Sequence, residues 1–131
     1  KNGAKLRQVI QNTWCKHSPK SLKLWGKVLS ELQYNPEHKI VTAIVPPEDS
    51  MEKAEIFEGL ANFLTSIYEA DIIIVLRQDS DNTIKCSMRT TKNNINVAKL
   101  AQKFGGGGHP KAAGYSFPGK IIRTEKGWQI S

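Results

Sequence analysis

A run of four glycines with an ordered tail is the feature that most constrains this chain. Residues 104–114 read FGGGGHPKAAG. Backbone without side chains can be approached closely and can adopt positive φ. A flexible linker would contain more serine and would lack a tail that begins with His109. A phosphate-binding loop that offers backbone donors and a titratable imidazole needs these residue types, whereas a mobile turn between a helix and a strand is the alternative.

Composition places the chain among ordinary globular proteins. Its 131 residues, 39% of them hydrophobic, are enough for one domain with a core. The longest apolar stretch, residues 72–76, is short and β-branched, which indicates a buried strand and not a membrane helix. No signal-peptide pattern is present, so we expect no membrane partner. Cys15 and Cys86 match no metal spacing and fit a reducing, cytoplasmic compartment, where both are expected to be small buried side chains.

Charge is unevenly distributed along the chain. The net charge of +7 suits a polyanion such as a nucleotide or RNA, although a solvated lysine-rich surface would give the same total. Residues 1–27 contain lysine and arginine but no acid, and residues 48–71 are mostly acidic among their charges. This pattern predicts a polarised surface. The chain opens at Lys1 in a basic helical pattern, so we expect it to be a piece of a longer protein.

Hydrophobic spacing predicts helices that alternate with strands. Helices are expected over residues 4–16 and from Ser18-Pro19 to Asn35-Pro36. A third should follow Asp49, which has capping-box spacing to Glu52. A fourth should run from Asn94 or Asn96 to Phe104, with the Phe104 ring pointing inward. Strands are expected over 39–45, 72–77, 83–89 and 115–117, with a last hairpin over 120–124 and 128–130. Along 83–89 the alternation separates Ile84, Cys86 and Met88 from Lys85, Ser87 and Arg89.

These elements predict an α/β (α+β) fold. Two of the strand pairs are hairpins, so a mixed sheet of about five strands with helices packed on it is favoured over an all-parallel one. We divide the chain into a helical lead-in over 1–36 and a domain over 37–131 that contains the glycine loop.

Three segments resemble one known family. Cys86-Ser87-Met88-Arg89, the helix 96–104 and the run from the glycines to Phe117 are similar to the DHH-associated domain (subfamily 1). That domain is the C-terminal substrate-binding part of DHH-family phosphoesterases. The likeness is strongest to the group that degrades short RNAs and dephosphorylates 3′-phosphoadenosine 5′-phosphate. It is sharp over 72–117, looser over 6–71 and absent after Gly119, and it implies the same fold.

The residues and the resemblance together indicate a phosphate site. The glycine run follows a helix, so the negative end of that helix dipole points at it, and phosphate must be held by other groups. The resemblance implies phosphate contacts from Arg89, which follows Ser87-Met88, and from His109. The loop amides of Gly105, Gly106, Gly107 and Gly108 complete the predicted set, with Lys111, for which a solvated lysine is the alternative. The run lacks a Gly-Lys-Ser/Thr sequence, which argues against a nucleoside triphosphatase.

No catalytic constellation is evident in the sequence. It contains neither Asp-His-His nor a two-metal cluster of Asp and His. The resemblance implies two divalent metal ions, usually manganese, in an N-terminal DHH domain. This chain should therefore bind the substrate but have no hydrolase activity alone. Its expected partners are that domain and a short RNA, a nucleotide or a cyclic dinucleotide, and a homodimer is left open. The alternatives are a non-catalytic RNA-binding module like the related domain of alanyl-tRNA synthetases, and a structural or dimerising domain.

Overall fold

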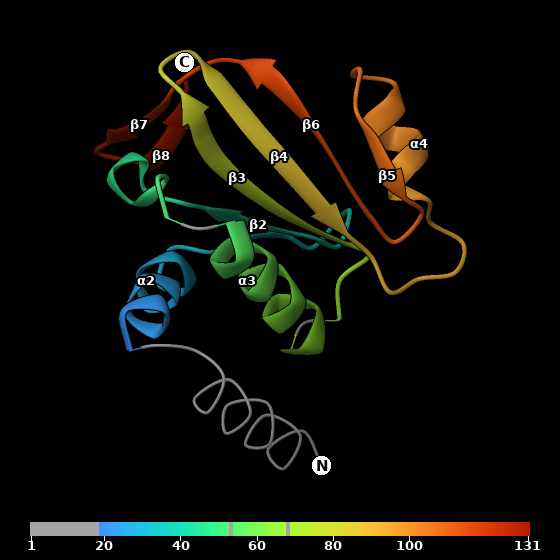
Figure 1. Cartoon of the computed structure of the whole chain (residues 1–131). Helices are drawn as coiled ribbons and strands as arrows, with labels where there is room; N and C mark the ends of the chain where they lie inside the picture. The colour runs from blue at the N-terminus through green and yellow to red at the C-terminus, as the bar shows by residue number, and fades with distance from the viewer. Residues whose placement is uncertain (1–18, 53, 68) are drawn as a thin grey trace.

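The computed structural model describes residues 19–52, 54–67 and 69–131 (Figure 1). The helix predicted over 4–16, Cys15 and the Ser18 cap lie outside these residues. The described elements, in chain order, are α2 (Pro19–Leu29), β1 (Gln33–Asn35), β2 (Ile40–Ile44), the 3₁₀ helix η1 (Pro47–Asp49), α3 (Ala54–Ile67), β3 (Ile72–Ser80), β4 (Thr83–Arg89), α4 (Val97–Gln102), β5 (Gly107–His109), β6 (Ala112–Pro118), β7 (Ile121–Thr124) and β8 (Gly127–Ile130). No helix of the described part is long and apolar enough to cross a membrane.

The main sheet has six strands in the order β1-β2-β3-β4-β6-β5. Only β2 and β3 pair in parallel; the other neighbours are antiparallel. The predicted mixed sheet with helices on it is therefore confirmed, with six strands in place of about five. β7 and β8 form a separate antiparallel pair, as the terminal hairpin pattern predicted.

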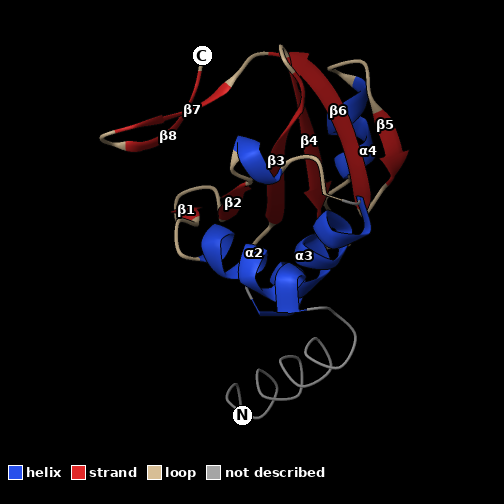
Figure 2. Ribbon diagram, turned by 60° about the vertical axis from the view of Figure 1, so that its left-hand side comes forward, coloured by secondary structure: helices blue, strands red, loops and turns tan. Residues whose placement is uncertain are grey.

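Helices cover different parts of the two sheet faces (Figures 1 and 2). α2 packs on β2, and α3 packs on β3 and β4, where they enclose a core of large side chains including Trp25, Leu60 and Leu64. α4 packs on β5 and β6 and encloses a second core with smaller members such as Ala98 and Ala101. Alternation along β4 assigns its side chains: Ile84, Cys86 and Met88 are buried toward α4. The opposite face of the sheet, away from α4, therefore carries Lys85, Ser87 and Arg89.

Several local predictions were wrong at their boundaries. α2 ends at Leu29, and the last part of the predicted helix instead forms β1 at the sheet edge. The predicted capping box fails because Asp49 closes a 3₁₀ turn that begins at Pro47. The cap of α4 is confirmed at Asn96, whose side chain accepts a 3.1 Å hydrogen bond from the Lys99 amide. Residues 107–109, expected as a loop, form β5.

Candidate phosphate-binding site

The first two glycines of the run terminate α4. The Gly105 amide donates to the Gln102 carbonyl (3.2 Å), and the Gly106 amide donates to the Ala101 carbonyl (2.9 Å). Gly105 has φ +85°, so these bonds form the left-handed helix ending that glycine favours. Both amides are thus used within the fold. The other two glycines, Gly107 and Gly108, pair with Gly114 and Ala113 of β6 in the β5–β6 hairpin, and a phosphate contact from their amides stays a prediction.

Positive φ at Gly105 and steric contacts at Gly106 and Gly108 explain three of the four glycines without a ligand. A Cβ on Gly106 would lie 2.1 Å from the Gly114 carbonyl oxygen. A Cβ on Gly108 would lie 2.7 Å from the Ala112 carbonyl oxygen. Gly108 also has φ +141°. A Cβ on Gly107 would meet nothing within 4 Å. Gly105 also has open space but has a positive φ, so Gly107 is the position of the run that combines open space with a backbone conformation that other residues adopt.

Strand register brings Arg89 and His109 to one end of the sheet. Ala112 of β6 pairs with Arg89 on one side and with His109 on the other. Directly paired residues of antiparallel strands project to the same face. Two strand spacings separate the two backbones, or about 10 Å. A small floor lies between the two long side chains, formed by Ala112 with the neighbouring pair Gly107 and Gly114.

Arg89 keeps its charge available. Its side chain is half-buried, and Nη1 donates a 3.2 Å hydrogen bond to the Met88 carbonyl. Among the described residues it forms no ion pair, whereas Arg77 and Arg123 lie beside Asp79 and Glu31. A guanidinium with one neutral acceptor and no described carboxylate partner can bind a phosphate through two parallel hydrogen bonds.

His109 is exposed and oriented by its own turn. Its Nδ1 accepts a 3.2 Å hydrogen bond from the Lys111 amide. The proton of the neutral imidazole is therefore on Nε2, which is left to donate to a ligand.

Four hydrogen bonds hold the turn that follows His109. The Lys111 carbonyl accepts from the Thr90 amide (3.1 Å), and the Pro110 carbonyl accepts from the Val97 amide (2.8 Å). Lys111 Nζ donates to Asn93 Oδ1 (2.8 Å) and to the Thr91 carbonyl (3.3 Å). The predicted contact residue Lys111 thus ties the hairpin to the loop that follows β4. Its hydrogen bonds place Arg89 and His109 relative to each other.

The sequence prediction omitted Ser87 and Lys85 from the site. The register places Ser87 opposite Gly114 and Lys85 opposite Ser116, on the same face as Arg89. The signal that could have found them is the alternation of β4, which sets Lys85, Ser87 and Arg89 apart from the buried residues. A hydroxyl and an ammonium therefore extend the row of polar groups along the floor.

Acidic residues are absent from this region. The sequence contains no Asp or Glu between Asp81 and Glu125. The basic residues in that interval are Lys85, Arg89, Lys92, Lys99, Lys103, Lys111, Lys120 and Arg123. β4, α4, β5 and β6 therefore contribute positive charge and no negative charge to the surface, which favours the approach of anions.

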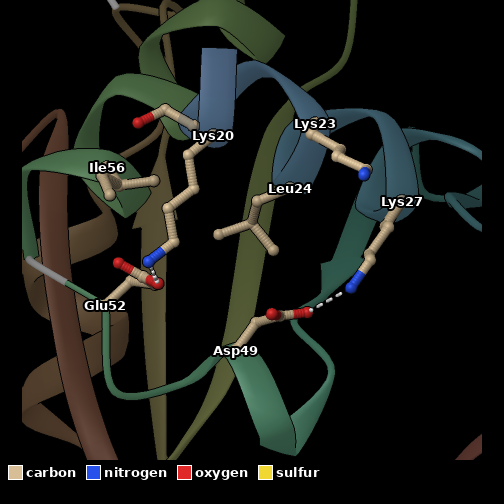
Figure 3. Close-up of a pocket in the computed structure, with 8 residues that line it drawn as sticks. Lys20, Lys23, Leu24, Lys27, Asp49, Glu52 and Ile56 are labelled. Atoms are coloured by element: carbon tan, nitrogen blue, oxygen red, sulfur yellow. Dashed lines mark hydrogen bonds and ion pairs between the residues drawn. The ribbon is translucent and has the colours of Figure 1, made fainter. Parts of the chain in front are cut away.

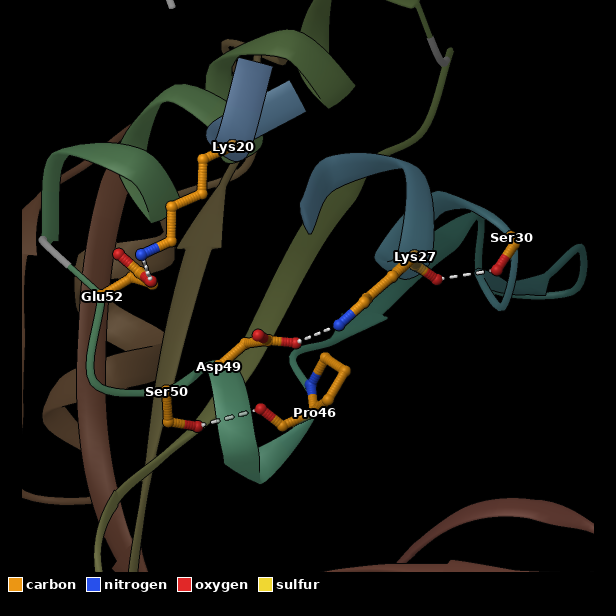
Figure 4. Close-up of polar contacts among 7 residues, drawn as sticks. All are labelled: Lys20, Lys27, Ser30, Pro46, Asp49, Ser50 and Glu52. Atoms are coloured by element: carbon orange, nitrogen blue, oxygen red, sulfur yellow. Dashed lines mark hydrogen bonds and ion pairs between the residues drawn. The ribbon is translucent and has the colours of Figure 1, made fainter. Parts of the chain in front are cut away.

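A lysine-rich hollow lies beside α2, away from the predicted site residues (Figure 3). It has a volume of about 220 Å³ and is closed by two ion pairs, Lys20–Glu52 at 2.8 Å and Lys27–Asp49 at 3.2 Å (Figure 4). These carboxylates partly neutralise the lysines and join α2 to the segment before α3. None of the predicted site residues lines this hollow, and we interpret it as a structural contact.

Metal-binding groups do not converge in the described part of the chain. No three His, Cys, Asp or Glu side chains gather there as a metal site would require. The residues described here therefore do not form the two-metal centre that the resemblance implies for a preceding domain.

Comparison with known proteins assigns this chain to a family. The sequence pattern of the DHHA1 domain matches residues 37–126. This chain belongs to the DHHA1 domain family. The family assignment confirms the resemblance over residues 72–117, and because the match continues to residue 126, the expectation that the resemblance is absent after Gly119 was wrong.

Two relatives show how much of a longer protein this chain matches. It is 29% identical over 102 residues to the bifunctional oligoribonuclease and PAP phosphatase NrnA of Thermus thermophilus, covering 77% of this chain and 30% of that protein. It is 28% identical to an exopolyphosphatase-related protein of Bacteroides fragilis, whose structure matches with a TM-score of 0.69 over 79% of this chain and 31% of that one. The chain thus spans about a third of the length of these relatives.

A third match supports the fold alone. The pGpG-specific phosphodiesterase PggH of Vibrio cholerae is 17% identical, with a TM-score of 0.53 over 76% of this chain and 34% of that one.

Proposed function

We propose that this chain is the substrate-binding domain of a DHH-family phosphoesterase and binds the phosphate of short oligoribonucleotides or related nucleotides. The observation that supports this most directly is that Arg89 and His109 both pair with Ala112 and so project from the same face of the sheet. The strands that carry them contain no Asp or Glu. The similarity to NrnA, which is named for oligoribonucleotide and PAP substrates, favours short RNA and 3′-phosphoadenosine 5′-phosphate. Cyclic dinucleotides carry the same phosphodiester chemistry and belong to the same proposal.

Each group has a separate role in this proposal. Arg89 binds two phosphate oxygens, and His109 donates from Nε2 to a third. Ser87 offers a hydroxyl at the floor, and Gly107 lets the ligand approach the backbone. Lys111 holds the turn and adds positive charge. Together these groups bind and orient a phosphodiester before reaction.

Hydrolysis is proposed to depend on a preceding DHH domain with two divalent metal ions, manganese in the first instance. These ions would supply activation of the attacking water. The described residues supply binding and orientation only. We therefore expect the 131-residue chain to release no mononucleotide from short RNA, even with manganese added. Sustained turnover by this chain, unchanged by further purification, would contradict the proposal. We also propose a cytoplasmic location, which suits the free thiol of Cys86.

The test uses a full-length protein that contains this domain. Arg89→Ala and His109→Ala should each lower kcat/KM by roughly thirtyfold to a thousandfold, since loss of one contact to an anion is worth on the order of 2–4 kcal/mol. Arg89→Lys should recover only part of the loss, because the ammonium cannot form the two parallel bonds. Arg123→Ala is the matched control, since this exposed arginine is already paired with Glu31.

Two outcomes would count against this site. Unchanged kcat/KM in both alanine variants would remove Arg89 and His109 from substrate binding. A fall in thermal stability that accounts for the lost activity would make their role structural.

A non-catalytic RNA-binding module is the second candidate, and the acid-free surface favours it as well. The two functions differ in the ligand that saturates the site. A small nucleotide with a terminal phosphate should compete fully with RNA if the first proposal holds. Binding that requires a long structured RNA and ignores small nucleotides would favour the second.

A further inference from the structure

Three aromatic rings form a ladder on the α4 side of the glycine hairpin. Phe104 stacks on Tyr115 with ring centroids 4.7 Å apart and planes at 22°, and Tyr115 contacts Phe117 at 5.9 Å. Tyr115 and Phe117 pack against the core beneath α4. Phe104 is 61% exposed, although the helical pattern predicted that it would point inward. One face of the Phe104 ring therefore rests on a fixed support while the other faces solvent.

This arrangement makes Phe104 a rigid platform. The residue follows the last turn of α4, and its amide donates to the Ala101 carbonyl at 3.0 Å. The chain then turns at Gly105, so the ring position is fixed by backbone hydrogen bonds and by the stacked tyrosine. An aromatic ring held in this way loses little conformational entropy when a flat partner stacks on it.

The charges around the platform favour a polyanion. Lys99 on α4 and Lys103 at its C-cap lie four residues apart, which places them on one side of the helix, and Lys103 directly precedes Phe104. Both are exposed, and the sequence interval around them contains no acid. Cationic groups combined with an exposed aromatic ring are the features that single-stranded nucleic acids bind, through backbone charge and base stacking.

The platform is continuous with the proposed phosphate site across a thin strand. Tyr115 lies on the α4 face of β6, whereas Arg89 and His109 lie on the opposite face. Beside β6 lies β5, the edge strand of the sheet, which ends at His109 and has glycine at its other two positions. Gly106 packs directly on Tyr115, where even a Cβ would come within 2.6 Å of the tyrosine Cβ. An extended ligand can therefore pass from one face to the other over little bulk.

We propose that Phe104 stacks on an unpaired base of a single-stranded oligonucleotide whose next phosphate groups lie at Arg89 and His109. This inference rests on the proposed function and extends it: the domain distinguishes strands of three or more nucleotides from dinucleotides. Lys99 and Lys103 contact the intervening backbone. The occupant is a base with its sugar-phosphate chain, and not a second protein surface.

The test measures binding of the 131-residue chain to three probes by calorimetry at low salt. The probes are the 5′-phosphorylated adenosine dinucleotide, the pentanucleotide of the same sequence, and a pentanucleotide backbone without bases. Phe104→Leu retains apolar packing on Tyr115 but lacks an aromatic plane, so it should weaken pentanucleotide binding about tenfold, in line with the loss of one stacked base. Binding of the dinucleotide and of the baseless strand should not change. Phe104→Trp should restore affinity, and its additional fluorescence should be quenched by the pentanucleotide.

Tyr34→Leu is the matched control, because Tyr34 is 52% exposed on β1 at the other end of the sheet. The proposal is overturned if Phe104→Leu binds the pentanucleotide as wild type does, if it weakens the baseless strand equally, or if the wild type does not bind the pentanucleotide. Arg89→Ala separates this inference from the proposed function. If Arg89→Ala leaves dinucleotide binding unchanged, the phosphate site is wrong; if only Phe104→Leu is silent, the platform alone is wrong.

Discussion

The two ends of the main sheet are built on different principles. The scaffold half, which comprises α2, α3 and β1 to β3, has a core of large side chains, and its lysines Lys20 and Lys27 are paired with carboxylates. The glycine half, residues 83–118, has a core in which Ala98, Ala101 and Ala113 lie beside larger residues such as Ile84 and Met88, and it contains no acid. Its Arg89 has no ion pair among the described residues. In the scaffold half, large side chains fill the core and carboxylates pair with these lysines. In the glycine half, the backbone of the glycines and the charge of Arg89 remain accessible.

This difference separates stability from binding within one sheet. Large apolar side chains supply most of the free energy of folding per residue, and they are concentrated under α2 and α3. Small residues in the glycine half let strands and α4 approach closely, which brings Arg89 and His109 together over a flat floor. The scaffold half can therefore support a surface that is not itself optimised for stability.

The largest expected effect comes from a cavity in the scaffold half. Leu60 is completely buried on α3, so Leu60→Ala should lower the free energy of unfolding by about 2–5 kcal/mol. Chemical denaturation measures this loss, and Glu58→Ala, an exposed position of the same helix, is the control. The folded fraction of the variant should keep its phosphate affinity, because the binding row lies on β4, β6 and β5. A loss no greater than that of the control would show that α3 does not stabilise the domain.

In the glycine half, adding a side chain to a glycine should lower the stability of the domain, whereas in the scaffold half truncating a side chain does so. Gly106→Ala forces a Cβ into the Gly114 carbonyl and should cost about 1–3 kcal/mol of stability or more. Gly107→Ala meets open space, so its stability should change by less than about 1 kcal/mol. Thermal unfolding of both variants, with ligand affinity measured alongside, checks the pair. Equal losses of stability would mean that the four glycines act as one steric unit.

Alkaline pH should weaken the glycine half through its buried thiol. Burial raises the pKa of Cys86 from 9.0 to about 11, with an opposing contribution from the Tyr115 hydroxyl, so the folded state holds the proton more tightly than the unfolded state. This stability is complete below pH 9 and falls between pH 9 and 11, by at most about 1.4 kcal/mol per pH unit. Burial also raises the pKa of Tyr115, to about 12. Cys86→Ala should show a shallower decline when unfolding is measured from pH 8 to 11; parallel curves would refute the assignment.

The smallest effects should distinguish a paired lysine from a free one. Lys27→Ala breaks the pair with Asp49 and should cost about 0.2–1 kcal/mol, less at high salt. Lys103→Ala should leave stability unchanged. It should nevertheless lower pentanucleotide affinity and reduce the salt slope by about 0.7, the value for one phosphate contact on a single strand. The reverse pattern would mean that the ligand binds at the α2 hollow.

Local sequence patterns determined most elements of this domain and its family. Alternation over 83–89 predicted β4 and the face that carries Arg89, because a strand repeats every two residues whatever surrounds it. Asn96 predicted the start of α4, because a cap needs only its own turn. The sequence FGGGGHPKAAG, together with Cys86-Ser87-Met88-Arg89, was sufficient to identify the DHHA1 domain.

The tertiary structure decided which of those residues act together. Only the register of β6 between β4 and β5 places Arg89 across from His109, and register depends on partners far apart in the chain. Sterics from β6 make Gly106 and Gly108 necessary and leave Gly107 open, a distinction that four identical letters cannot carry. Phe104 fits the apolar side of a helical pattern, yet α4 ends before it, so its ring lies outside on Tyr115. Sequence periodicity predicts which side of its own helix or strand a residue lies on. The pairing of Arg89 with His109, the need for glycine at two positions and the exposure of Phe104 depend instead on contacts between elements.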